Sequence, residues 1–272
     1  MATIASLHVY PVKSCRGIDL AAARVTGTGL EWDRRWMLVD GKGTFISQRS
    51  HPLLATVGTS IDRGVLGLSA AGRPPFRLRD NAGGQRRRVR IWKDHCSAID
   101  EGDEAAGWFS GVLGDAVRLV RFDDRERRLA DPKYAGPGRP VAFADGYPLL
   151  LMSLASLADL NGRLSRPVPM DRFRPNVVID GAAAYAEDSA AVFGSGPVRL
   201  QAAKPCTRCV TTTTDQRAGT RDTDGEPLRT LRGYRYDPAL RGIAFGQNCV
   251  IEAGAGAELH VAAELTLGPH HV

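Results

Sequence analysis

Short stretches in which apolar and polar residues alternate recur along the chain. The alternation is clearest at residues 7–10, 88–91 and 198–202, and clusters of turn-forming residues such as 40–43 and 136–138 lie between such stretches. Because successive side chains of a strand point to opposite faces, a period of two predicts half-buried strands. We therefore expect many short strands joined by tight turns.

Two segments have the spacing of an amphipathic helix instead. The first would be capped by Asp103 and end at Gly114, with an apolar face made of Trp108, Phe109, Val112 and Leu113. The second would be capped by Ser153, with an apolar face made of Leu154, Leu157, Leu160 and Leu164. Few short helices among many strands predict an α+β fold that is mostly β, with the helices packed on a partly closed sheet or barrel.

One segment has the composition of an exposed connection between two domains. Residues 123–140 combine a dense charge run with a cluster of glycine and proline, and such segments commonly join compact units. We therefore place a division near residue 120, which gives a first domain over 1–120 and a second over 121–272.

The composition is that of a soluble globular protein. Of the 272 residues, 43% are hydrophobic and 24% are charged, which excludes a disordered or collagen-like chain. No stretch reaches the roughly 20 apolar residues of a membrane-spanning helix, and the first residues lack the basic and apolar regions of a secretion signal. We expect a cytoplasmic protein with no membrane partner.

The net charge of +6 favours acidic ligands or partners. Nucleic acid is one class of acidic partner, and the chain contains a short basic run made of Arg86, Arg87, Arg88 and Arg90. This run has no interleaved aromatic residues and no recognised binding module beside it. We interpret it as the solvated edge of a sheet and expect no nucleic-acid partner.

The five cysteines are too dispersed for a disulfide framework. Cys206 and Cys209 alone are closely spaced, and Arg208 between them would favour the thiolate that binds metal. A structural zinc site would need about two further ligands, for which Cys249 and His260 are the downstream candidates. The two thiols could also form a redox pair or be plain buried cysteines. A single thiolate that serves a cofactor-borne metal fits better, because soft sulfur suits redox-active metals.

Three further segments combine cations with aromatic or hydroxyl residues, namely residues 10–17, 33–36 and 172–176. Arginine forks and a lysine that converge from distant segments suit a phosphate group or a pterin ring. The alternative for each single arginine is a surface ion pair, which contributes little stability. The chain has no Walker-type phosphate loop, no dinucleotide fingerprint and no Ser/His/Asp set. These observations together favour chemistry carried by a bound cofactor.

The sequence blocks resemble a known family. The resemblance extends from about residue 3 to about residue 267 and rests on the ordered blocks YPVKSCRG, DRRWMLVD, SQR, ADGYPLLLMSLASLADLN, RFRPNVVIDG, AEDS, KPCTRCVTTTTDQRAG and FGQNCV. Together these blocks resemble the MOSC-domain family, in the branch of the mitochondrial amidoxime-reducing component and its bacterial relatives. The resemblance implies an N-terminal β-rich domain, a MOSC β-barrel-like domain with packed helices, and a molybdenum-molybdopterin cofactor held between them.

The resemblance also assigns residues. It implies that Cys209 is the protein ligand of the metal, beside the two dithiolene sulfurs of the pterin, and that Cys206 has no metal role. Asp145 matches an acidic position near the metal, and we expect it to be the catalytic proton donor. The implied cofactor-binding residues are Lys13, Ser14, Arg34, Arg174, Asn176, Thr207, Arg208 and Asn248. Relatives often carry a tyrosine in place of Asn248.

The activity that the resemblance implies is the reduction of N-hydroxylated compounds such as amidoximes, hydroxylamines and N-hydroxylated bases. The metal would change between Mo(VI) and Mo(IV) and accept the oxygen of the substrate. No cysteine follows Cys249, so we expect electrons from a separate ferredoxin-like or cytochrome-like donor rather than from an appended iron–sulfur domain. Two different functions stay open beside this one: a carrier of the cofactor, or of sulfur as a persulfide on Cys209, and a β-rich protein in which the cysteine pair is structural.

Overall fold

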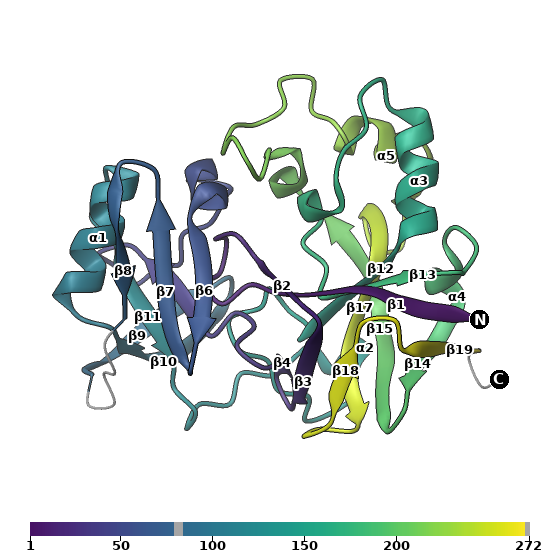
Figure 1. The fold of residues 1–272 in the computed structure, drawn as a ribbon, viewed down its shortest axis with the longest axis horizontal. Helices are drawn as coiled ribbons and strands as arrows, with labels where there is room; N and C mark the ends of the chain where they lie inside the picture. Colours follow the sequence, from purple (N-terminus) through teal and green to yellow (C-terminus); the bar gives the residue numbers. More distant parts are fainter. Residues whose placement is uncertain (79–83, 270–272) are drawn as a thin grey trace.

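A computed structural model describes residues 1–78 and 84–269. Figure 1 shows two halves side by side. One contains the strands β6 to β11 with helix α1, and the other contains the strands β12 to β19 with helices α3, α4 and α5. The N-terminal strand β1 lies in the second of these halves. The prediction of a mostly β fold with few helices is confirmed.

The strands of the second half close into a barrel. Their order around it is β12 (Leu149–Ser153), β13 (Val177–Asp180), β1 (Ala2–Val9), β19 (Glu264–Pro269), β14 (Ala190–Ser195), β15 (Val198–Arg208) and β17 (Gly242–Ala253). β17 then pairs with β12, where Asn248 faces Leu150, and this pairing closes the ring. β12 and β13 are parallel, and the other neighbours in the ring are antiparallel. Closure leaves the ring strands without free edges.

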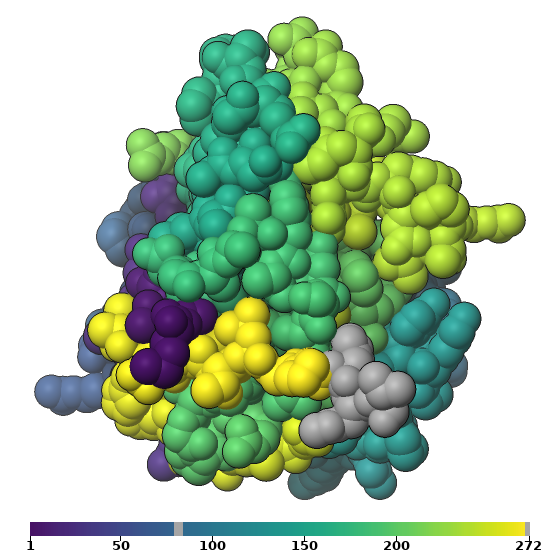
Figure 2. All heavy atoms as spheres, turned by 90° about the vertical axis from the view of Figure 1, so that its right-hand side faces the viewer, coloured from purple at the N-terminus to yellow at the C-terminus, as the bar shows by residue number. Residues whose placement is uncertain are grey.

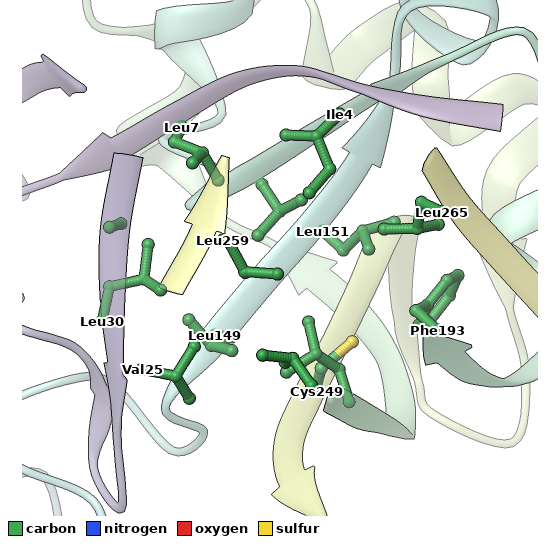
Figure 3. Close-up of a cluster of buried hydrophobic side chains, with 14 of the residues drawn as sticks. Ile4, Leu7, Val25, Leu30, Leu149, Leu151, Phe193, Cys249, Leu259 and Leu265 are labelled. Carbon is green, nitrogen blue, oxygen red and sulfur yellow. The ribbon is translucent and has the colours of Figure 1, made fainter. Parts of the chain in front are cut away.

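The interior of the barrel is apolar. Figure 3 shows side chains from opposite sides of the ring, among them Ile4, Leu151 and Phe193, pointing toward one another. Leu7 and Val9 are buried as the alternation in their strand predicts. In Figure 2 the first residues, in purple, lie beside the yellow C-terminal strand, in agreement with the pairing of β1 with β19. The two ends of the described chain are thereby fixed in one core.

The first half consists of smaller sheets. One sheet has the order β5 (Trp36–Val39), β11 (Arg118–Phe122), β10 (Asp94–Asp100) and β9 (Arg86–Ile91), and a second has the order β6 (Gly58–Asp62), β7 (Val65–Ala70) and β8 (Arg73–Arg77). A third small sheet belongs to the barrel half instead. It joins β3 (Ala22–Thr26) to β4 (Gly29–Leu30) and to β18 (Glu258–His260), and its Val25, Leu30 and Leu259 are buried in the barrel core. β2 (Ile18–Leu20) pairs with β1, and β16 (Tyr236–Asp237) pairs with β17. β11 includes residue 120, and β1 belongs to the barrel although it comes first in the sequence. The domain boundary near residue 120 stays a prediction.

The predicted helices are present, with one change of cap. Ser153 caps α3 (Leu154–Arg163) by accepting a hydrogen bond from the Ser156 amide at 3.0 Å. Gly102, not Asp103, precedes α1 (Asp103–Leu113). Asp103 lies in the first turn, where its carboxylate faces the positive end of the helix dipole. The other helical segments are η1 (Pro52–Thr56), α2 (Pro132–Ala135), η2 (Met170–Arg172), α4 (Ala186–Ser189), η3 (Val210–Thr213) and α5 (Leu228–Arg235).

Within the described ranges, no helix has both the length and the apolar character that crossing a bilayer requires. The charge run expected to be an exposed connection is partly buried instead. Arg128 is 7% exposed and donates to the carbonyl oxygens of Ala142 and Ala144 at 2.8 and 2.5 Å and of Asp145 at 2.8 Å. Its guanidinium satisfies carbonyl groups that would otherwise lack partners, and it thereby holds the loop that carries Asp145.

Candidate functional site

The residues predicted for the site line one pocket between the two halves. They are Lys13, Ser14 and Arg34 from the first half and Asp145, Arg174, Asn176, Thr207, Arg208, Cys209 and Asn248 from the second. Most of these residues lie in loops that follow or precede strands of the barrel and of the smaller sheets. The same pocket is lined by residues to which the sequence analysis gave no role in the site, among them Ser47, Arg49, Thr211 and Thr212.

Three of the lining residues have a left-handed backbone. The φ angles of Ser14, Arg34 and Arg174 are 73°, 47° and 56°. This conformation is uncommon for residues other than glycine, and it persists where the surrounding structure fixes it, typically at ligand sites. The backbone at these three positions would favour glycine, yet the sequence has serine and two arginines there. We infer that these side chains contribute to the function of the pocket.

Two guanidinium groups lie on one aromatic ring at one end of the pocket. Arg34 and Arg174 are 4.3 and 4.2 Å from the centre of the Tyr10 ring. Arg34 donates to Asp33 at 2.5 Å, and Arg174 donates from Nη1 to Gln216 at 3.2 Å. The Nη2 atom of Arg174 is buried and has no hydrogen-bond partner. Burial lowers the pKa of Arg174 to about 10 against the opposing effect of Tyr10. A buried cation with an unpaired donor is a group that an anion would stabilise.

Asn176 lines this end of the pocket, and its side-chain amide forms hydrogen bonds within the protein. Its Oδ1 atom accepts from Arg34 at 3.0 Å and from the Leu150 amide at 3.2 Å, and its Nδ2 atom donates to the His8 carbonyl at 3.1 Å. The side chain is 1% exposed. Asn176 therefore fixes the Arg34 guanidinium and joins two barrel strands, β1 through His8 and β12 through Leu150.

Arg208 is also anchored within the protein. It donates to the carbonyl oxygens of Phe245 and Phe173 at 2.8 and 3.2 Å and to the Met152 sulfur at 3.1 Å. Its guanidinium lies 5.3 Å from the centre of the Phe173 ring. These contacts fix the position of Arg208 and thereby restrict the backbone between Cys206 and Cys209.

Lys13 and Asp145 form an ion pair in the pocket. Lys13 Nζ donates to Asp145 Oδ1 at 2.5 Å and to the Phe143 carbonyl at 2.8 Å. Burial lowers the pKa of Lys13, and Asp145 offsets part of that effect. Partial desolvation opposes the charge of Asp145, but the Lys13 ammonium overrides it and holds the pKa of Asp145 well below its usual range. Asp145 is therefore ionised at neutral pH, which does not favour the expected role as proton donor.

The two neighbouring thiols have different surroundings. Cys206 lies where the pairing of β15 with β17 is irregular, and it packs against the apolar cluster around Phe245. Burial raises the pKa of the Cys206 thiol, although Arg208 counteracts it. Cys209 directly precedes η3, and its sulfur accepts a hydrogen bond from Arg49 Nη2 at 3.0 Å. Both thiols line the pocket. They differ in that a thiolate on Cys209 has a cationic hydrogen-bond donor, whereas Cys206 packs against an apolar cluster.

Sequence reasoning gave Arg49 no role, although its block contributed to the resemblance. The contact with Cys209 joins residues 160 positions apart, so no local pattern could predict it. All five cysteines are unpaired. In the part of the chain that the structure describes, no group of three or more His, Cys, Asp or Glu side chains could hold a metal ion.

Two segments of the chain match domains of known proteins. Residues 1–116 match the MOSC N-terminal beta barrel domain, and residues 138–264 match the MOSC domain. The chain belongs to the MOSC-domain family. Within this family it lies in the branch of the mitochondrial amidoxime-reducing components, as the resemblance indicated.

The relatives in that branch cover most of the chain. Mitochondrial amidoxime-reducing component 1 is 35% identical in mouse, over 92% of this chain and 78% of the relative, and 35% identical in human, over 92% and 79%. Mitochondrial amidoxime reducing component 2 of rat is 35% identical over 89% of this chain and 75% of its own length. The chain is therefore similar, over most of its length, to proteins named for amidoxime reduction.

Proposed function

We propose that this MOSC protein is a molybdenum-cofactor-dependent reductase of N-hydroxylated compounds. The observation that carries the proposal is the Cys209 sulfur, which accepts a hydrogen bond from Arg49 and shares its pocket with the cations Lys13, Arg34 and Arg174. The names of the relatives support the amidoxime substrates.

The residues of the pocket fit a phosphorylated pterin that carries a metal. The buried and unpaired Nη2 atom of Arg174 lacks an acceptor, and a phosphate oxygen would provide one. Cys209 supplies a soft ligand, and the absence of a complete metal site among the described side chains agrees with a metal that arrives with its own sulfur ligands. When bound, the cofactor supplies a metal that can change its oxidation state by two.

The chain's own residues bind and orient in this proposal. Arg174 and Lys13 neutralise the anionic cofactor, and Asn176 holds Arg34 against Tyr10 for the same purpose. The other proposed cofactor contacts are Ser14, Thr207, Arg208 and Asn248. Cys209 is the proposed metal ligand. Cys206, in its apolar setting, has no metal role.

Reduction of an N-hydroxylated substrate breaks the N–O bond with two electrons and two protons, and it releases the amine or amidine and water. Because its low pKa keeps Asp145 ionised, we propose that Asp145 acts at the site by holding the Lys13 ammonium, and that the protons come from solvent. The electrons are proposed to come from a separate donor protein, either ferredoxin-like or cytochrome-like. The net charge of +6 favours an acidic donor.

The free state of all five cysteines supports a reducing compartment, and we propose the cytoplasm. The decisive experiment measures the turnover of an aromatic amidoxime by purified protein with a chemical electron donor. The same sample is analysed for molybdenum, for pterin and, by mass spectrometry, for a persulfide on Cys209. Turnover that depends on molybdenum supports the reductase. A persulfide without molybdenum and without turnover would support a sulfur carrier instead.

A further inference from the structure

Arg49 and Trp92 form a connected pair of side chains at the edge of the pocket. The Arg49 guanidinium lies 4.2 Å from the centre of the Trp92 ring and donates from Nη2 to Cys209 Sγ at 3.0 Å. Trp92 donates from Nε1 to Asp145 at 3.1 Å. The pair therefore joins the proposed metal ligand to the acid that holds Lys13.

Tryptophan is an unusual residue for the turn position that Trp92 occupies. Ile91 faces Asp94 across the β9–β10 hairpin, so Trp92 is the first residue of a two-residue turn, and its φ angle is 55°. Glycine, asparagine or aspartate normally occupies that position. The Trp92 side chain is 41% exposed and makes an edge contact with Phe45 at 4.8 Å between ring centres. A large aromatic residue in a left-handed turn is the kind of local exception found at functional sites.

The backbone around Arg49 is held from the other half of the molecule. Arg221 donates to the carbonyl oxygen of Gln48 at 3.3 Å and also to that of Arg49. The side-chain amides of Gln48 and Gln216 exchange two hydrogen bonds, at 2.9 and 3.0 Å. Arg49 is thus fixed at its backbone by these contacts and at its guanidinium by Trp92, which leaves its Nη2 atom directed at the sulfur.

We propose that Arg49 is a positioning residue for the molybdenum site, acting through the sulfur of Cys209, and that Trp92 holds it in place. The inference rests on the proposed function, in which Cys209 binds the metal. A cationic donor withdraws electron density from a sulfur ligand, and hydrogen bonds to ligating sulfur are one of the means by which proteins set a reduction potential. With the cofactor bound, the contact would therefore favour the reduced metal over the oxidised metal.

The test uses loaded enzyme with Arg49→Met, Arg49→Lys, Trp92→Phe and Trp92→Ala. The readouts are molybdenum per chain, the reduction potential of the metal followed by electron paramagnetic resonance, and kcat and KM measured separately. We expect Arg49→Met to shift the one-electron equilibrium about tenfold toward the oxidised metal, or about 59 mV. Its kcat should fall about tenfold, with KM within about twofold of the wild-type value.

The remaining variants rank the contributions of charge and ring stacking to the reduction potential. Arg49→Lys keeps the charge and should recover part of the potential, and Trp92→Ala should shift the potential in the same direction as Arg49→Met by a smaller amount. Trp92→Phe keeps a ring for Arg49 to stack on and should shift it least. Arg77→Met is the matched control, because Arg77 forms an exposed ion pair with Asp62, and it should change none of the readouts.

Two results separate the failure of this inference from that of the proposed function. Arg49→Met, Arg49→Lys and Trp92→Ala enzymes that load with metal and keep the wild-type potential would overturn the role of Arg49 and leave the proposed function intact. Wild-type protein that contains no molybdenum and does not reduce an amidoxime would overturn the proposed function, and this inference with it. Should Arg49→Met lose the metal, the potentials of Arg49→Lys and Trp92→Ala decide the question.

Discussion

The two ends of the pocket are built in different ways. At the guanidinium end, Arg34 and Arg174 line the pocket and share the ring of Tyr10, and one buried donor of Arg174 has no partner. At the sulfur end, formed by Cys206 and Cys209, one thiol has a cationic donor at 3.0 Å and its neighbour packs against an apolar cluster.

The difference separates two tasks. The guanidinium end contains a buried cationic donor that an anion would satisfy, so it is suited to binding an anionic ligand. The sulfur end distinguishes between two chemically identical side chains by what surrounds them, so it is suited to presenting one thiolate. The following variants test whether the two ends are as different as their surroundings imply.

The largest effect is expected at the sulfur end. Cys209→Ala should lower kcat/KM for an amidoxime by about 100-fold or more, because it removes the proposed metal ligand. Cys206→Ala should keep kcat/KM within about threefold, since it removes a thiol from an apolar cluster. Steady-state kinetics on both variants provide the comparison. Equal losses in the two would contradict the asymmetry between the thiols.

At the guanidinium end, Arg174→Met should weaken the retention of the cofactor about 10- to 100-fold, since one charge-assisted hydrogen bond is worth about 1.5–3 kcal/mol. The same variant should raise the stability of cofactor-free protein by about 1 kcal/mol, because it replaces a desolvated cation by an apolar side chain. Pterin content after gel filtration and denaturant unfolding measure the two effects. A variant that loses stability and keeps the cofactor would assign Arg174 a structural role.

Tyr10→Phe separates the ring of Tyr10 from its hydroxyl. The hydroxyl donates to the Pro175 carbonyl at 3.0 Å in the buried interior, so its loss should lower the free energy of unfolding by about 1 kcal/mol. The ring on which Arg34 and Arg174 stack is kept, so cofactor retention should stay within about twofold of wild type. A large loss of cofactor in Tyr10→Phe would show that the guanidinium end depends on more than stacking.

The smallest effect concerns the pair of Lys13 and Asp145. The lowered pKa of Asp145 stabilises the folded state above the pKa of the unfolded chain, about 4, and this contribution disappears as the pH falls below that value. Asp145→Asn should therefore lower the stability at about pH 6 by about 1 kcal/mol or less, because the Asp145 side chain is 65% exposed and the pair is screened. The difference from wild type should shrink toward about pH 3. A difference that grows on acidification would contradict the pairing.

The sequence predicted the elements whose pattern is local. Leu7 and Val9 alternate with polar neighbours because their strand has one apolar face, and Ser153 precedes an apolar helical face because a helix start needs an acceptor. The cap at Gly102 was not predicted, because its role depends on a left-handed backbone and not on a side-chain acceptor.

The site was predicted through the family resemblance, and its long-range contacts were not. Nothing near Arg49 in the sequence indicates that it reaches Cys209, and nothing in the charge run indicates that Arg128 is buried beneath the loop of Asp145. Such contacts depend on how the two halves pack, which alternation and spacing do not specify. The unpaired donor of Arg174 likewise becomes visible only when its surroundings are known.

X-ray absorption at the molybdenum edge counts the sulfur ligands of the metal and so tests whether Cys209 is one of them. The measurement compares loaded wild-type protein with Cys209→Ala and Cys206→Ala. If Cys209 is the metal ligand, Cys209→Ala has one sulfur fewer around the metal than wild type, and Cys206→Ala has the same number as wild type. An unchanged sulfur count in Cys209→Ala would contradict the assignment of Cys209 as the metal ligand.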